Sequence, residues 1–380
     1  MGRRVRKRWG DTTVEFSTRD TLAWRMASLL LRPGHLSPPA DVAGVVEWFG
    51  AMQAQDVASG LWSLGVRLPG STVGDVQAAL ERREALRTWP MRGTVHLVPS
   101  RDAHWMLAVL GERALAGAAR RREVLGLSEQ TADRAVEVLG AALAGGGRFT
   151  RDECRQALAE AGVDCAGQLL YHLLWYASQR GVLCIAPHVG TEQTFVLLDE
   201  WVPDPHRPER DEALATIALR YFRSHGPTTR QDFAGWTGLT AADARRGIAA
   251  AGDALTTVRV EGVEMVMTPE LRDAGPPPPA DDLWTLPGFD EYLLGFKDRS
   301  LMVDREHLSA IVPGGNGVFQ STVVRSGRVV ATWKRTVGRK QTVVRVAPLV
   351  DLDPAERARV EEAFGPYGHF VGQPLRIDWP

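Results

Sequence analysis

The chain of 380 residues repeats one order of predicted elements, and this repetition limits the possible folds more than the overall composition does. Residues 148–198 and 226–266 each predict a helix, a turn, a second helix and a β-hairpin. Thr150 and Thr229 occupy matching places, where each can cap a helix that carries acidic residues in its first turn. This order is the outline of a winged helix.

Local signals set the expected bounds of these two units. Gly162 and Gly238 end the first helices, and Thr240 caps a helix that runs to Ala251. The second helix of the earlier unit spans residues 168–179, with leucines on its apolar side. Strands are expected at residues 182–185, 195–198, 258–260 and 263–266.

A third, less regular copy fits the N-terminal part of the chain. Strands are expected at residues 86–89 and 94–98, and a longer helix runs from Arg101 past Trp105. That long helix carries three consecutive arginines, Arg120, Arg121 and Arg122, which we expect to be exposed and to contact DNA. Four shorter helices precede the strands, at residues 22–31, 41–49, 57–64 and 73–82.

The character of the sequence changes after the proline run at residues 275–279, which is a natural boundary. Runs of β-branched residues separated by turn signals predict a small β-barrel or a curled sheet. One helix (354–364) and a terminal strand (374–378) follow. The β-branched runs lie at residues 310–312, 318–319, 322–324, 329–333 and 342–346.

Together these patterns predict an α+β protein with three tandem winged-helix units and a C-terminal small β-barrel. The expected domains are a basic N-terminal arm (1–20), three winged helices (21–145, 146–205 and 206–275) and the barrel (280–380).

Composition excludes several classes of protein. The formal net charge of −1 means that any nucleic-acid surface must be a local patch balanced by acid elsewhere. Three cysteines without a C-x-x-C pair exclude a four-cysteine metal site or cluster within one chain, and we expect no metal and no cofactor. The basic N-terminus lacks an apolar segment and no run is long enough to cross a bilayer, so we expect a cytoplasmic protein without membrane contact.

A local basic patch is present in the C-terminal part. From residue 323 to residue 347 there are seven basic residues and no acidic residue. This pattern favours phosphate binding, although a solvated hairpin would show the same charge. The turns at residues 313–317 and 336–340 are the candidate groove-contacting hairpins, and the second is basic. The candidate DNA-binding residues here are Lys334, Arg335, Arg339 and Lys340.

Three separated motifs carry a family resemblance. They are residues 52–56 (MQAQD), residues 87–98 (RTWPMRGTVHLV) and residues 289–300 (FDEYLLGFKDRS). In this order they resemble the bacterial AlkZ/YcaQ-like family of tandem winged-helix DNA glycosylases, over about residues 21–371. The resemblance implies a C-shaped cradle around double-stranded DNA and hydrolysis of the glycosidic bond of alkylated purines, especially N7-alkylguanine. The expected substrates include bulky natural-product adducts and interstrand crosslinks, and the expected role is base excision repair or antibiotic self-resistance.

The resemblance places the catalytic element of the family on Gln53 and Gln55. An N7-alkylated guanine already carries positive charge and leaves without protonation, so the general acid of ordinary glycoside cleavage is not required. An amide oxygen can accept a hydrogen bond from the attacking water, and the amide N–H groups can donate to sugar, phosphate or base. On an extended segment both glutamines project from one side and Ala54 from the other.

Three further residues are possible lining of the active site, and each has a structural alternative. Asp56 can stabilise positive charge at the sugar, but it also suits the N-cap of the helix at residue 57, which we favour. Arg92 can hold a phosphate and His96 can line the site, or either can brace the Gln53 segment. In the motif at residues 289–300, we favour interdomain salt bridges over DNA contacts.

A second function class remains open from the sequence. Tandem helix-turn-helix units alone also fit a non-enzymatic transcriptional regulator. Such regulators usually bind DNA as symmetric dimers, and the sequence shows no heptad seam, so we expect a monomeric enzyme that acts on DNA carrying alkylated purines. Nothing in the sequence identifies the adduct.

Overall fold

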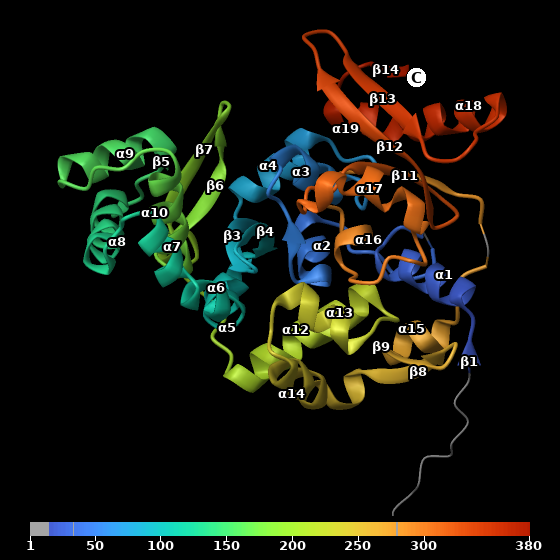
Figure 1. Cartoon of the computed structure of the whole chain (residues 1–380), viewed down its shortest axis with the longest axis horizontal. Coiled ribbons are helices and arrows are strands. Elements are labelled where there is room, and N and C mark those ends of the chain that lie inside the picture. Colours follow the sequence, from blue (N-terminus) through green and yellow to red (C-terminus); the bar gives the residue numbers. More distant parts are fainter. Residues whose placement is uncertain (1–14, 33, 279) are drawn as a thin grey trace, which may run out of the picture.

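The computed structural model describes residues 15–32, 34–278 and 280–380, and it shows a mixed α+β fold (Figure 1). The predicted N-terminal arm lies mostly in residues 1–14, outside the described part. Its last residues are ordered: β1 (Glu15–Phe16) pairs in parallel with β8 (Thr256–Val260), and α1 (Thr18–Ser28) begins with a capping box at Ser17. Residues 15–20 therefore do not belong to a loose arm.

One order of elements occurs three times: a helix, a short extended segment, two helices and a β-hairpin. The first repeat contains α2 (Val42–Phe49), β2 (Met52–Gln53), α3 (Val57–Gly65), α4 (Val73–Glu81), β3 (Ala85–Met91) and β4 (Thr94–Pro99). The second contains α8 (Glu129–Leu143), β5 (Phe149–Thr150), α9 (Arg151–Glu160), α10 (Gln168–Gln179), β6 (Leu183–Val189) and β7 (Glu192–Leu197). The third contains α12 (Arg210–His225), α13 (Arg230–Thr237), α14 (Ala241–Ala251), β8 and β9 (Val263–Met267).

The repeats share their pairing as well as their order. The short segment pairs antiparallel with the last strand of its own hairpin, as β2 with β4 and β5 with β7. In the third repeat, Thr228 forms an isolated bridge with Val266 in the same place. The predicted caps are present: Thr150 and Thr229 each form a capping box, and Thr240 caps α14.

Two connections differ from the expected elements. The predicted long helix after Arg101 is wrong: it is broken into α5 (Ala103–Leu110), α6 (Glu112–Ala116) and α7 (Ala118–Val124), with breaks at Gly111 and Gly117. Two helices at the starts of repeats, α8 and α12, were not expected. Because α8 packs against α9 and α10 in one apolar core, its packing favours grouping it with the second repeat. The predicted domain boundaries stay predictions.

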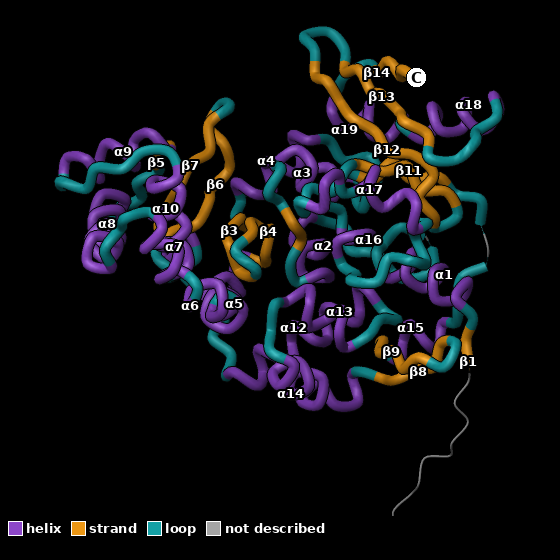
Figure 2. Tube along the Cα trace, in the orientation of Figure 1, coloured by secondary structure: helices purple, strands orange, loops and turns teal. Residues whose placement is uncertain are grey.

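The first two repeats form one six-stranded sheet in the order β2-β4-β3-β6-β7-β5. Arg87 on β3 pairs with Ile185 on β6 at the junction. Figure 2 shows these strands between the lobe of α8, α9 and α10 and the main body of the molecule. The strand that carries Gln53 is therefore an edge of the sheet.

The C-terminal part is an open sheet, and the predicted closed barrel is wrong. Its strands run in the order β10-β11-β12-β13-β14, and no pairing joins β10 to β14 within the described residues. The run at residues 310–312 belongs to a short helix, and residues 313–315 form a 3-10 turn instead of a hairpin. The elements are β10 (Leu283–Leu286), α16 (Glu291–Leu294), α17 (Leu308–Ile311), β11 (Ser321–Arg325), β12 (Arg328–Val337), β13 (Thr342–Pro348), α18 (Pro354–Ala363), α19 (Gly365–Val371) and β14 (Leu375–Asp378).

The core of the first repeat continues into this C-terminal part. Trp62 of α3 packs against Tyr367 and Phe370 of α19, with ring centroids 5.1 and 5.0 Å away. Burial of these aromatic faces fixes the position of α3, and with it the preceding Gln53–Gln55 segment, relative to the C-terminal sheet. Two short helices, α11 (Leu198–Trp201) and α15 (Pro269–Ala274), complete the fold.

Candidate active site and nucleic-acid interface

Gln53 ends strand β2, Ala54 follows it, and Gln55 lies at a bend, so the projection of both glutamines from one side stays a prediction. Gln53 pairs with His96 in the β2–β4 register, and the Ala54 N–H donates to the Val95 carbonyl at 2.9 Å. Ala54 lies in the apolar core, Gln53 is 8% exposed, and Gln55 is exposed. Among the described residues the Gln53 carboxamide has no hydrogen-bond partner. Gln55 is therefore accessible to solvent, whereas Gln53 is largely buried with a carboxamide that makes no hydrogen bond to the described residues.

Gln55 lies on the wall of a cavity of about 460 Å³ between the first and second repeats. Its Oε1 accepts a hydrogen bond from the Val95 N–H at 3.1 Å, which holds the carboxamide against β4. Arg87 and Trp89 of β3 line the same cavity, and Arg151 and Tyr171 of the second repeat form the opposite wall. The cavity thus lies where the hairpins of the first and second repeats join in one sheet, a junction that the sequence alone did not predict.

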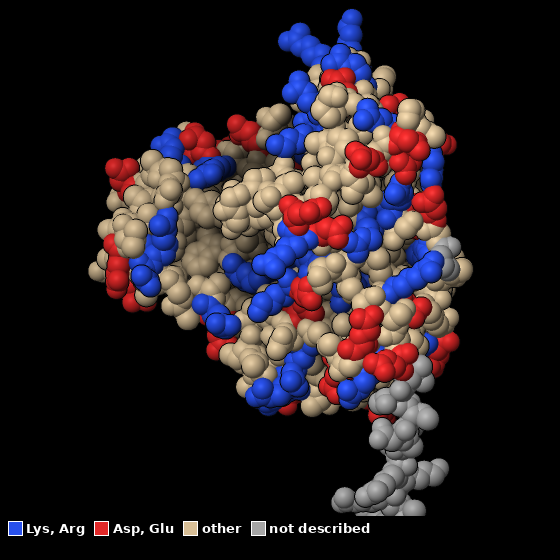
Figure 3. All heavy atoms as spheres, turned by 45° about the vertical axis from the view of Figure 1, so that its right-hand side comes forward, with Lys and Arg blue, Asp and Glu red and all other residues tan. Residues whose placement is uncertain are grey.

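A second cavity, of about 760 Å³, adjoins the first through shared lining by Arg151 and Tyr171. Its wall carries four arginines and no Asp or Glu among the described residues. Figure 3 shows the molecule hollowed beside the lobe of the second repeat, with Lys and Arg side chains along the hollow. Arg113 and Arg151 were not predicted as site residues. The four arginines are Arg92, Arg113, Arg121 and Arg151.

The side chain of Glu291 holds the backbone of the Gln53 segment. Its Oε1 accepts the Gln53 N–H at 3.1 Å, and its Oε2 accepts from Trp236 Nε1 at 2.8 Å and lies 3.3 Å from His225 Nε2. Glu291 is 1% exposed. Burial opposes its ionisation, but hydrogen bonds and electrostatic attraction from His225, with the Trp236 hydrogen bond, lower the pKa of Glu291 below its ordinary value. A buried carboxylate thus joins β2 to α12, α13 and α16.

The adjacent Asp290 forms a buried ion pair with Arg67 of the first repeat, at 2.8 Å. The favoured interpretation of this motif, interdomain ion pairing, therefore agrees with the contacts of Asp290. The contact of Glu291 with the Gln53 backbone was not expected from the sequence. The available signal was an acidic pair directly before the apolar run Tyr292–Leu294, since charges next to buried residues usually have partners.

Asp56 has the predicted structural role. Its side chain caps α3 by accepting the Ser59 N–H at 2.9 Å. It also pairs with Arg335 across 3.1 Å, which brings the C-terminal sheet against the start of α3. Arg335 is thus paired with a carboxylate within the protein, and its contact with DNA stays a prediction.

Arg92 and His96 form a pair at the hairpin between β3 and β4. His96 is fully buried, its Nδ1 lies 2.8 Å from the Thr94 carbonyl, and its Nε2 lies 3.2 Å from Arg92 Nη2. Burial and the adjacent Arg92 lower the pKa of His96 to about 3, so the ring is neutral and Nε2 can accept from Arg92. His96 therefore braces the exposed Arg92 instead of lining a cavity, while Arg92 lines the larger one.

The predicted arginine cluster of residues 120–122 separates into different environments. Arg120 is exposed on α7, and Arg121 lines the larger cavity, where it donates to Gln168. Arg122 is only 7% exposed, pairs with Glu129 at 3.4 Å and lies over the ring of Tyr176. The expected exposure of Arg122 is therefore not seen, because its face of α7 packs on α10, and its contact with DNA stays a prediction.

The basic C-terminal segment is less free than its composition suggests. Arg325 and Arg328 pair with Glu356 and Asp304, as Arg335 does with Asp56. The exposed cations without an ion pair among the described residues are Lys334, Arg339, Lys340 and Arg345, around the turn between β12 and β13. This turn projects from the body of the molecule (Figure 1).

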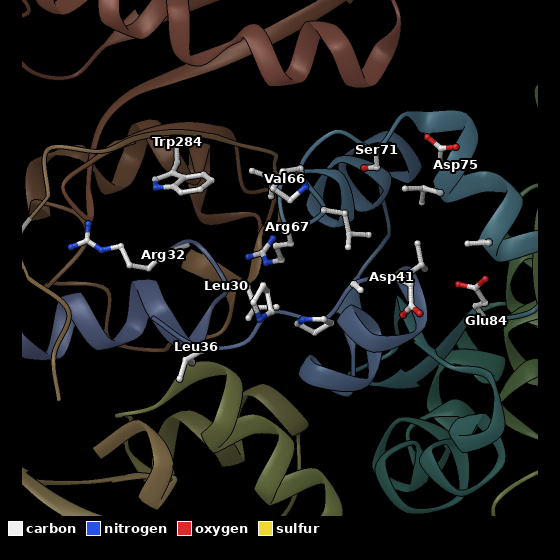
Figure 4. A pocket seen from close by; sticks show the side chains of 18 of the residues that line it. Leu30, Arg32, Leu36, Asp41, Val66, Arg67, Ser71, Asp75, Glu84 and Trp284 are labelled. Atoms are coloured by element: carbon white, nitrogen blue, oxygen red, sulfur yellow. The ribbon is translucent and has the colours of Figure 1, made fainter. Parts of the chain in front are cut away.

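Another cavity of about 460 Å³ lies between α2, α4 and β10 and contains none of the predicted site residues (Figure 4). Trp284, Leu30 and Arg67 are among its lining residues. In the described part of the chain no cluster of His, Cys, Asp and Glu could hold a metal ion. The described helices include none with the length and apolar character needed to cross a membrane.

The cavity that Gln55 lines adjoins a cavity with four arginines and no Asp or Glu among its described lining residues. On a fold of repeated helix–helix–hairpin units, this basic concavity indicates a nucleic-acid-binding class of protein. Residues 46–370 match the AlkZ-like family, described as "DNA glycosylase AlkZ-like". The chain belongs to this family, and it is a DNA glycosylase, a hydrolase of N-glycosyl bonds. The enzyme class is thus confirmed over the transcriptional regulator.

Two comparisons with proteins from Streptomyces sahachiroi agree. The chain is 29% identical over 367 residues to an interstrand DNA cross-link repair glycosylase, covering 92% of this chain and 96% of that protein. It is similar to the solved structure of the DNA glycosylase AlkZ, with a TM-score of 0.75 and 26% identity. That match covers 96% of this chain and all of the other.

Gly60 of α3 allows the helix to approach the glutamine segment. A Cβ added at this position would lie 2.9 Å from Ala54 Cβ and 3.1 Å from its Cα. We expect Gly60→Ala to displace the segment, lowering glycosylase activity about 10-fold and the free energy of unfolding by about 1–3 kcal/mol. Gly74→Ala on α4 is the matched control, because its new Cβ would meet only Thr72 Oγ1, at 3.6 Å. Equal activity of the two variants would contradict the expectation.

The low pKa of His96 predicts a pH dependence of stability. The unfolded state binds a proton near pH 6.5 and the folded state only near pH 3, so stability decreases as the pH falls through this window. Between pH 7 and pH 5 this one group should lower the free energy of unfolding by about 2 kcal/mol. Urea unfolding of the parent and of His96→Gln at both pH values measures this loss. If the variant loses as much stability between pH 7 and pH 5 as the parent does, the assignment to His96 is disproved.

Proposed function

We propose that this glycosylase hydrolyses the glycosidic bond of N7-alkylguanine and related alkylpurine adducts in duplex DNA, including bulky natural-product adducts and interstrand crosslinks. The observation that carries the proposal is the position of Gln55 on a cavity wall that continues into an acid-free cavity with four arginines. The similarity to an interstrand DNA cross-link repair glycosylase of Streptomyces sahachiroi supports crosslinks as substrates. We interpret the three repeats as winged helices.

The proposed reaction uses the charge of the lesion. The C1′–N9 bond breaks, the electron pair of that bond neutralises the cationic purine, and an oxocarbenium-like sugar forms. Water adds to C1′ and releases its proton to solvent. The free carboxamide of Gln53 and the second lone pair of Gln55 Oε1 can accept hydrogen bonds from this water. Because neither glutamine is an acid, neutral guanine is not activated and should survive.

An excision assay tests the proposal. The chain is incubated with duplex DNA that carries a single N7-alkylguanine, and alkali-labile abasic sites are counted against spontaneous depurination. We expect excess abasic sites with the lesion and none with unmodified guanine. No excess with any of several small, bulky or crosslinking N7 adducts would end this assignment.

The β12–β13 turn is expected to bind the DNA backbone. The triple variant Lys334→Gln, Arg339→Gln and Lys340→Gln should bind duplex DNA more weakly and reduce the slope of log K against log [salt] by up to about 3. Arg272→Gln, an exposed arginine paired with Asp273, is the control and should leave the slope unchanged. The same slope in both proteins would place this turn outside the interface.

A further inference from the structure

Arg87 on β3 is a buried arginine without a carboxylate partner. Its side chain is 6% exposed, and its Nε has no hydrogen-bond partner in the described part of the chain. Within the described residues its guanidinium makes one hydrogen bond, a long one from Nη2 to the Ala54 carbonyl, at 3.4 Å. The acidic group that acts on Arg87 electrostatically, Asp56, is already paired with Arg335 at 3.1 Å. Burial lowers the pKa of Arg87 to about 10, so the group stays charged at neutral pH.

The surroundings of Arg87 do not supply the missing anion. The cavity shared with Gln55 has two carboxylates: Asp152 pairs with Arg155 at 2.8 Å, and Glu192 is exposed at the β6–β7 turn. The small cavity on the other side of Arg87 has no Asp or Glu among its described lining residues. His188 lines that cavity, and burial together with the charge of Arg87 lowers its pKa.

A buried charge without a partner is costly, and proteins normally pair it or use it. The planar guanidinium matches a phosphate geometrically and can donate two parallel hydrogen bonds to it. The missing partner at Arg87 is therefore best supplied by an anion that enters the cavity from outside, beside Gln55.

We propose that Arg87 binds a backbone phosphodiester of the damaged nucleotide, and thereby places its sugar over Gln53 and Gln55; this inference rests on the proposed function. The hydrogen bond to the Ala54 carbonyl ties the guanidinium to the same backbone that carries both glutamines. The distance between a bound phosphate and the two carboxamides is thus set by three neighbouring strands, β2, β4 and β3. Such positioning raises the rate by holding the sugar and the attacking water in register.

Binding of a non-cleavable probe tests the inference separately from catalysis. The full chain is titrated with a duplex that contains one tetrahydrofuran abasic analogue, between 50 and 200 mM KCl. We expect Arg87→Gln to raise Kd about 10–100-fold and to reduce the salt slope by about 1. Arg87→Lys should keep the slope because it keeps the charge, while losing part of the affinity. Arg134→Gln, an exposed arginine paired with Glu137 on α8, should match the parent.

Thermal unfolding of the DNA-free proteins separates a binding role from a structural one, because the two roles predict different changes in Tm for Arg87→Gln. Loss of an unpaired buried charge should leave Tm equal or raise it, whereas loss of a structural arginine lowers it. A parent-like salt slope in Arg87→Gln, a fall in Tm of about 5 °C or more, or failure of this variant to fold would each overturn the inference. Normal excision of N7-alkylguanine by the parent alongside any of these results would leave the proposed function intact. Absence of excision with a reduced slope in Arg87→Gln would overturn the function and keep the phosphate site.

Discussion

Replacing both glutamines, Gln53→Ala with Gln55→Ala, should lower single-turnover excision of N7-alkylguanine by about 10²–10⁴-fold, toward the spontaneous rate. The physical reason is that the cationic base leaves without an acid, so the enzyme contributes mainly by orienting water and sugar. With both carboxamides truncated, the water loses the two amide oxygens proposed to orient it. The rate is measured at saturating enzyme, so that weakened binding does not contribute.

Gln193→Ala is the matched control for this prediction. Gln193 lines the same cavity as Gln55 but lies on β7, outside the catalytic segment. We expect it to keep a rate within about 3-fold of the parent, because no role in orienting water is assigned to it. Parent-like activity in the double variant, or an equal loss in Gln193→Ala, would show that Gln53 and Gln55 have no special role.

The second large effect is expected at Glu291. Glu291→Ala removes the acceptor of the Gln53 N–H and the partner of Trp236 and His225 at once. Leaving these buried donors without a partner should lower the free energy of unfolding by about 3–5 kcal/mol. The change is measured by urea unfolding at pH 7, where the lowered pKa keeps the parent Glu291 ionised.

Glu291→Gln distinguishes positioning from general destabilisation. A glutamine has one side-chain oxygen where glutamate has two. This oxygen can accept from the Gln53 N–H, but it cannot also reach Trp236 Nε1 on the other side. We expect it to fold, to bind abasic-site DNA with an unchanged Kd, and to lose about 10-fold in the excision rate constant. A variant with a parent-like rate and reduced stability would show that Glu291 acts only in folding.

Much of the fold follows from local sequence signals. Thr150, Thr229 and Thr240 cap helices as predicted, and α10 begins and ends where the sequence indicated. These features depend on hydrogen bonds and apolar spacing among residues a few positions apart.

The features that local signals did not indicate concern residues whose partners are distant in the sequence. Arg122 packs on Tyr176, and Arg335 pairs with Asp56, contacts that composition alone did not reveal. Residues 310–312 include two β-branched residues, yet Ile311 ends a short helix and Val312 follows it, since strand propensity depends on context. Closure of the C-terminal sheet likewise depends on whether its first and last strands meet, which strand patterns do not specify.

By itself, the sequence determined the repeated helix–helix–hairpin order and the capped helix starts, because both arise from neighbouring residues. The tertiary structure alone decided that Gln55 lines a cavity at the junction of two repeats, that the Glu291 side chain holds the Gln53 backbone, and that Arg87 has no carboxylate partner among the described residues. The reason is physical: the energy of a buried charge depends on which groups surround it, and those groups come from distant segments, as the 238 residues between Gln53 and Glu291 show.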